Sequence, residues 1–198
     1  GESEGLTQWD PPEISTAPEG GTRIWLNLRY LAKDGSTVLT EKRLITVSSP
    51  DDHGYAIDWS AQFEAKVPAL LDRTPITGKP DGQSWGGYAG LSLRMPKLDD
   101  PVIASDAGIF LFVDGLANRD ARAVDYSGII DGKRWGVAIF QYGGSPVDRT
   151  PWYAINKPEV PFHYFSPALL YRAPRALKAG ELLFLKYRIG IHGNAISA

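Results

Sequence analysis

Hydrophobic and polar residues alternate along most of this chain with the two-residue period of a β-strand. In residues 22–31 and 37–48, one face of each strand is expected to be buried and the other to be a solvated polar face to which we assign no chemistry. Turn residues separate the segments, as Asp34-Gly35 does after the first of them. The pattern predicts strands over residues 22–31, 37–48, 55–66, 85–95, 107–114, 163–171 and 181–191.

The clearest single element is a hairpin over residues 122–141. Asp131-Gly132 separates two runs that are rich in β-branched and aromatic residues. An Asp-Gly pair supplies the positive φ angles of a two-residue hairpin turn. We expect the apolar side chains of this hairpin to lie deep in the core, namely Tyr126, Ile129, Ile130, Trp135, Val137, Ile139 and Phe140.

No stretch of about 12 residues has the period of an amphipathic helix, and no internal repeat is visible. The 21 glycines and 15 prolines suit many short strands joined by tight turns. The sequence therefore predicts an all-β protein, an antiparallel β-sandwich. Residues 1–21 are polar and broken by Pro11, Pro12 and Pro18, so we expect an irregular lead-in followed by a single domain over residues 22–198.

The composition argues against several classes of binding partner and of chemistry. The net charge is −2 with interleaved signs, which argues against nucleic acid and against an electrostatic membrane surface. There is no cysteine, so disulfides, thiol catalysis and cysteine-bound metals are excluded, although this does not fix the cellular compartment. No apolar run approaches the roughly 18 residues of a spanning helix. We expect no cofactor.

Common catalytic motifs are missing. The three histidines, His53, His163 and His192, lie far apart in the sequence, so no metal-ligand spacing is present and we predict no metal site. There is no Gly-x-Ser-x-Gly elbow, and Ser127 is interpreted as an ordinary strand serine. Glycoside hydrolysis needs two carboxylates about 5–10 Å apart, but sequence spacing alone cannot pair the candidates.

The most promising polar group of residues lies just after the hairpin, over residues 142–157, which we expect to form a loop. Arg149, Trp152, Tyr153 and Asn156 combine a guanidinium, two rings and an amide, and His163 follows closely. Such a mixture suits a sugar, whose apolar face stacks on rings while polar groups bind its hydroxyls. The alternative is a proline-pinned connection whose Trp152 and Phe162 cap the core. Arg94 is a further candidate ligand anchor, although a paired or surface arginine remains open.

Five segments together resemble one bacterial family. They are IDWSAQFEA (57–65), GGYAGLSLRM (86–95), ARAVDYSGIIDGKRWGVAIFQ (121–141), RTPWYAINKP (149–158) and LKAGELLFLKYRIGIHGN (177–194). The chain is similar over most of its length to the PmoA-like family of uncharacterised proteins (DUF6807), whose members also carry the name methane oxygenase.

The resemblance implies a sandwich similar to the galactose mutarotase-like supersandwich. It also implies a protein from bacteria that degrade polysaccharides, with a periplasmic or extracellular location and a cytoplasmic one as the alternative. Methane oxidation is not expected, because the sequence has neither membrane helices nor a histidine cluster. Members are usually longer and carry an N-terminal His-His-Arg-Gly motif that this sequence lacks, so the chain is expected to lack the family's N-terminal part.

These observations lead to a soluble β-sandwich that acts on or binds carbohydrate. The ligand surface is predicted at Arg94, Arg149, Trp152, Tyr153 and Asn156. If the protein is an enzyme of epimerase, lyase or glycosidase type, His163 or Asp125 is predicted as its general acid or base. Two alternatives stay open, a non-catalytic carbohydrate-binding module and a structural or interaction domain without a sugar site. The oligomeric state is also open.

Overall fold

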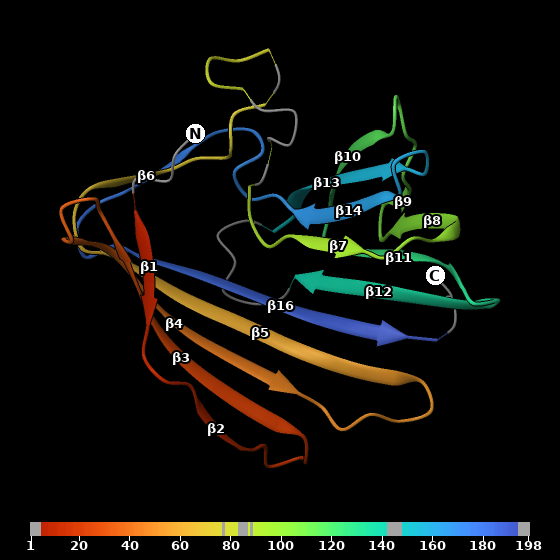
Figure 1. Cartoon of the computed structure of the whole chain (residues 1–198), viewed down its shortest axis with the longest axis horizontal. Helices are drawn as coiled ribbons and strands as arrows, with labels where there is room; N and C mark the ends of the chain where they lie inside the picture. The colour runs from red at the N-terminus through yellow and green to blue at the C-terminus, as the bar shows by residue number, and fades with distance from the viewer. Residues whose placement is uncertain (1–4, 77, 83–86, 88, 142–147, 194–198) are drawn as a thin grey trace.

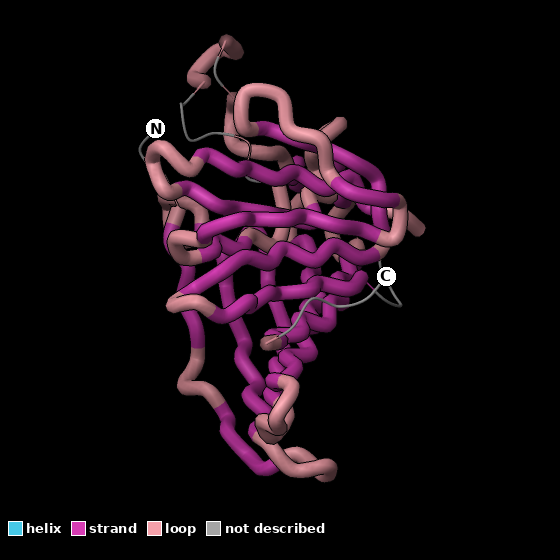
Figure 2. The backbone as a smooth tube through the Cα atoms, turned by 90° about the vertical axis from the view of Figure 1, so that its right-hand side faces the viewer, coloured by secondary structure: helices cyan, strands magenta, loops and turns pink. Residues whose placement is uncertain are grey.

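The chain is built from β-strands packed in layers. The structure is a computed structural model that describes residues 5–76, 78–82, 87, 89–141 and 148–193. All regular elements in these ranges are strands, and every strand pair is antiparallel (Figures 1 and 2). This confirms the predicted all-β, antiparallel sandwich.

The larger layer is a ten-stranded sheet with the order β1-β3-β4-β5-β16-β12-β11-β8-β9, in which β2 also pairs with β3. The last strand of the chain, β16, lies between β5 and β12, so the two halves of the sheet are joined by its C-terminal strand. The strands are β1 (Leu6–Trp9), β2 (Glu13–Thr16), β3 (Thr22–Leu31), β4 (Thr37–Val47), β5 (Gly54–Ala65), β8 (Asp99–Ser105), β9 (Gly108–Ile109), β11 (Ala123–Ile130), β12 (Lys133–Gln141) and β16 (Leu182–His192).

The smaller layer is a four-stranded sheet with the order β10-β13-β14-β7, and it lies over the β16-β12-β11 part of the large sheet (Figure 1). The core fills the space between the two layers, where the ring of Tyr126 packs edge-on against Phe165 at 5.6 Å. The strands are β7 (Leu93–Met95), β10 (Leu116–Ala121), β13 (Thr150–Lys157) and β14 (Phe162–Pro167); β6 (Ala69–Leu71) and β15 (Arg175–Leu177) form a separate pair.

The predicted hairpin is confirmed as β11 and β12. Asp131 and Gly132 have φ angles of 50° and 75°, as a two-residue turn of this kind requires. Tyr126 and Ile139 are fully buried, but Trp135 and Phe140 are each 40% exposed, so the expectation of a wholly buried hairpin was wrong for them. Phe140 lies on the face of β12 that points away from the small sheet, and Trp135 lies near the turn beside Gly193.

The N-terminal segment differs from its prediction. Instead of an irregular lead-in, residues 6–9 and 13–16 form β1 and β2, which pair with different parts of β3. Pro11 and Pro12 lie between the two strands, where no ladder hydrogen bond is lost. Both strands are exposed along their whole length, including the apolar side chains of Leu6, Trp9 and Ile14.

The expected functional loop is also corrected. Residues 150–157 form β13, an interior strand of the small sheet, while residues 142–147 lie outside the described part of the chain. The alternation that identifies the strand is present, since Trp152 and Ala154 are buried and Tyr153 and Ile155 are only partly so. Pro151 is compatible with the strand because it lies at its second residue. The strand predicted over residues 107–114 is reduced to β9.

Candidate functional site

Trp152 is a core residue in this structure. Its side chain is fully buried on the inner face of β13 and is stacked on Phe165 with the ring centroids 6.2 Å apart. Its indole Nε1 donates a hydrogen bond to the carbonyl oxygen of Ala121 at 2.9 Å, which satisfies the polar atom of the ring. The residue therefore caps the core, which is the alternative that the sequence left open.

His163 is likewise inside the sandwich. It pairs in register with Asn156 across β13 and β14, and its Nδ1 lies 3.0 Å from the hydroxyl of Tyr126. The hydroxyl of Tyr126 donates its one proton to the carbonyl oxygen of Ile155 at 3.1 Å, so toward Nδ1 of His163 it is the acceptor. Burial lowers the pKa of His163 because a charged imidazole would lose its hydration. The ring is therefore neutral at pH 7 and ties the two sheets together.

Asp125 lies on the opposite face of β11 from Tyr126, because successive strand residues point to opposite sides. Its Oδ1 is 2.8 Å from Nε2 of His192, and both side chains are largely buried on the outer face of the large sheet. The imidazole passes over Gly136 of β12, where an added Cβ would lie 2.5 Å from the ring. Asp125 and His163 are thus on different sides of the sheet and do not share one catalytic centre.

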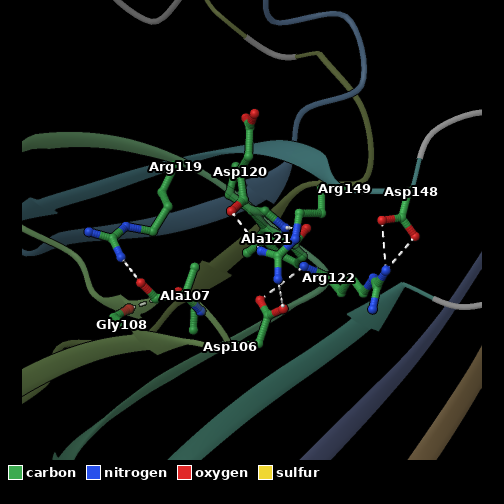
Figure 3. A network of polar contacts seen from close by, with 11 residues as sticks. Asp106, Ala107, Gly108, Arg119, Asp120, Ala121, Arg122, Asp148 and Arg149 are labelled. Atoms are coloured by element: carbon green, nitrogen blue, oxygen red, sulfur yellow. Dashed lines mark hydrogen bonds and ion pairs between the residues drawn. The ribbon is translucent and has the colours of Figure 1, made fainter.

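Arg149 belongs to a network of charged side chains at one end of the sandwich (Figure 3). Its Nη2 donates to Asp106 at 2.7 Å and its Nη1 to the carbonyl oxygen of Asp120 at 3.3 Å. Arg122 donates to both carboxylate oxygens of Asp148, at 2.7 and 2.6 Å, and Arg119 donates to the carbonyl oxygen of Ala107. The guanidinium of Arg149 is therefore occupied by protein partners that connect β10, β13 and the β8-β9 turn.

Strand β4 carries a buried carboxylate, Glu41, that the sequence did not predict, because no chemistry was assigned to this strand. The carboxylate of Glu41 is fully buried and accepts hydrogen bonds from the Tyr30 hydroxyl at 2.6 Å and from Arg43 at 2.6 and 2.9 Å. Burial and the bond to Glu41 raise the pKa of Tyr30 far above its usual range. The Arg43 guanidinium lies 5.6 Å from the ring centre of Trp59. These hydrogen bonds join the three side chains to one another, which is the arrangement of a structural network.

Asn156 lies on the inner face of β13, opposite His163 in register, and its buried Oδ1 has no hydrogen-bond partner among the described residues. Arg94 and Tyr153 are different, because they share the outer face of the small sheet. There they belong to a continuous line of rings, which we call the aromatic row: Phe162, Tyr164, Tyr153 and Tyr171. Phe162 is stacked on Tyr164 at 6.2 Å, Tyr164 meets Tyr153 edge-on at 6.2 Å, and Tyr153 is stacked on Tyr171 at 5.7 Å.

The two ends of the aromatic row are each covered by an arginine. Arg94 lies over Phe162 at 4.7 Å and Arg73 over Tyr171 at 5.2 Å. Tyr164, in the middle, is buried and its hydroxyl is 2.8 Å from that of Ser92, whereas the other three rings are half-buried and accessible. Contact between strands β13 and β14 explains the middle of the row, but Tyr171 and Arg73 come from loops and no sequence pattern places them there.

A pocket of about 310 Å³ continues from the Arg73 end of the aromatic row. Its charged lining consists of Arg73, Lys79, Arg172 and one carboxylate, Asp72. The remaining lining residues are apolar, namely Pro75, Ile76, Pro80, Leu170, Ala173 and Pro174. The volume lies at the lower end of the range of small-molecule sites in proteins. The row and this pocket form the candidate site.

Within the described ranges no three histidine, aspartate or glutamate side chains are grouped so that they could hold a metal ion. The same residues contain no helix with the length and hydrophobicity that a bilayer crossing requires.

Comparison with known proteins gives a family but no characterised relative. No curated protein matches the chain. A family model described as a family of unknown function, DUF6807, matches residues 10–198, which is nearly the whole sequence. The chain therefore belongs to the DUF6807 family.

Proposed function

We propose that this protein binds carbohydrate through the aromatic row and the adjoining pocket. The observation that carries the proposal is that four ring residues from β13, β14 and the segment after β14 form one line on a single sheet face and end at a cavity. A pyranose has an apolar face that stacks on a ring and hydroxyls that bind guanidinium groups. Arg94 and Arg73 supply such groups at both ends.

The proposal assigns binding and no turnover. His163 and Asp125 are engaged with Tyr126 and His192, away from the outer face of the small sheet, so neither is given a catalytic role here. Binding of polymeric glycan also agrees with the PmoA-like resemblance and with a periplasmic or extracellular location, which we include in the proposal.

The test is a glycan array followed by calorimetric titration of the best oligosaccharide. Tyr153→Ala and Tyr171→Ala should each weaken binding about tenfold or more, because ring contacts at the centre of a site commonly contribute over 1 kcal/mol. Phe184→Ala is the matched control, since Phe184 is a partly exposed ring on the outer face of the large sheet. Heat unfolding of each variant confirms that it is folded.

Unchanged affinity in folded Tyr153→Ala and Tyr171→Ala proteins would contradict the proposal. Equal loss in Phe184→Ala would contradict it as well, because binding would then not depend on this face.

An interaction domain without a sugar site is the second candidate. It is favoured by a run of exposed apolar side chains beside the edge strand β9, where Ile109, Leu111 and Val113 are 62%, 80% and 73% exposed. Apolar residues at an unpaired sheet edge commonly mark a contact surface. Under this alternative the glycan array is negative, and Leu111→Ser reduces self-association or partner binding measured by light scattering.

A further inference from the structure

We propose that the glycan is acidic: the aromatic row and its pocket are suited to sugar units that carry a carboxylate or a sulfate group. This inference rests on the proposed function and specifies the ligand class of the same site. Its basis is the unequal distribution of positive and negative side chains around the row.

The arginines that cover the two ends of the row differ from most arginines of the chain. Neither Arg73 nor Arg94 makes an ion pair with any residue that the structure describes, and each lies over a ring. Contact with a ring does not occupy the N–H groups of a guanidinium, so they can still bind a carboxylate in bidentate fashion. By contrast, eight other arginines pair with carboxylates: Arg29, Arg43, Arg122, Arg134, Arg149, Arg172, Arg175 and Arg188.

The pocket lining also has more positive than negative side chains. Three cations line it against one carboxylate, Asp72, and one of the cations, Arg172, is held by both oxygens of Asp120 at 2.7 and 2.8 Å. Arg73 and Lys79 are left to act on a ligand, since Lys79 too makes no ion pair within the described part of the chain. Proline, isoleucine and leucine side chains beside these charges form low-dielectric walls, which strengthen the attraction of the charges for an anion.

The hydrogen-bonding inventory favours the same ligand. A neutral sugar offers hydroxyls that both donate and accept, so sites for neutral sugars need acceptor side chains as well as donors. Here Arg73, Lys79 and Arg172 can only donate, and Asp72 is the single acceptor side chain in the pocket lining. A carboxylate or sulfate group, which only accepts, matches this set of donors.

The test compares one backbone in two charge states and adds a second, sulfated backbone. De-esterified oligogalacturonide carries carboxylates, its fully methyl-esterified form is neutral, and a sulfated galactan oligosaccharide separates sulfate from carboxylate as the anion. Each is titrated into the full chain at low and high salt. We expect the de-esterified or the sulfated form to bind at least about tenfold tighter than the methyl ester, and this preference to shrink at high salt because exposed charges are screened.

Variants show which residues produce the preference for acidic glycan. Arg73→Gln and the exposed Lys79→Glu should each remove most of the acidic preference, and the charge reversal should have the larger effect. Arg149→Gln is the control because its guanidinium is already bound by Asp106. Heat unfolding identifies any variant that is not folded, and Lys79→Glu, on the surface, keeps the test available if Arg73→Gln is unstable.

The outcomes separate the two proposals. Equal binding of charged and neutral forms overturns the acidic specificity and leaves carbohydrate binding intact. An acidic preference that survives in folded Arg73→Gln and Lys79→Glu also overturns the inference. Failure of every glycan on the array, charged or neutral, overturns both the inference and the proposed function.

Discussion

The Nε2 atom of His192 lies 2.8 Å from Oδ1 of Asp125, although 67 positions separate the two residues in the chain. The pair spans three strands, β16, β12 and β11, and the intervening strand carries Gly136 where the imidazole passes. No side chain other than hydrogen fits at that position, because a Cβ would approach the ring to 2.5 Å and the Cβ of Ser127 to 2.8 Å.

Gly136→Ala should therefore displace His192 and destabilise the protein by about 1–3 kcal/mol, the usual cost of overpacking a closely packed site. Gly190→Ala is the matched control. Gly190 lies on the same face of β16 as His192, and the atom nearest to a Cβ added there is 3.9 Å away. Urea unfolding measures both variants. Equal destabilisation by the two substitutions would contradict the assigned role of Gly136.

The stability of the protein should fall in mild acid because of His163. Its pKa is lowered from 6.5 in the folded state, so below about pH 6.5 the unfolded chain binds a proton that the native protein does not. The free energy of unfolding should decrease as pH falls through this range, by at most about 1.4 kcal/mol per pH unit, and level off only below the lowered native pKa. In His163→Gln this decrease in the free energy of unfolding should be absent when urea unfolding is measured between pH 5 and 7.5.

Arg43 should be needed to hold the buried charge of Glu41. Removing it in Arg43→Ala leaves a fully buried carboxylate with one neutral partner, Tyr30, and should cost about 3–5 kcal/mol in the free energy of unfolding. Arg122→Ala is the comparison, because the Arg122–Asp148 pair is exposed and its loss should change stability little. A small effect in Arg43→Ala would show that the cluster is not a structural network.

Neighbouring residues of β13 should respond differently to truncation. Trp152→Ala removes a fully buried ring and should destabilise the protein by about 3–5 kcal/mol. Tyr153→Ala, on the outer face, should cost less stability but reduce glycan binding. Urea unfolding and calorimetric titration of the two variants check the assignment, and the reverse order of stabilities would contradict it.

Local patterns were sufficient for much of the fold. The Asp131-Gly132 hairpin was predicted from two turn residues and their flanking runs, and β3, β4, β5 and β16 occur within one or two residues of their predicted ranges. Prolines misled the prediction in two places. Residues 6–16 and 150–157 form strands because each proline lies between strands or close to a strand end, where it removes no needed hydrogen bond.

The candidate site was harder to predict, because residues that lie next to each other in sequence can be on opposite faces of a strand. Trp152 and Tyr153 were predicted together as ligand residues, and the structure places one in the core and the other in the aromatic row. Arg149 was predicted as a ligand anchor, and its partner Asp106 belongs to a turn 43 positions away. No local sequence pattern predicted that Arg73 and Tyr171 belong to the candidate site.

The sequence by itself determined that the chain forms strands, where most of them begin and end, and that they build an all-β antiparallel sandwich, because the two-residue period and the turn residues act over a few positions. Only the tertiary structure decided which strands are neighbours and which face of each strand is covered. Insertion of β16 between β5 and β12 brings His192 to Asp125, and packing of the small sheet on the large one buries Trp152 and His163 while leaving Arg94 and Tyr153 outside. These relations depend on contacts between distant segments, which no local period encodes.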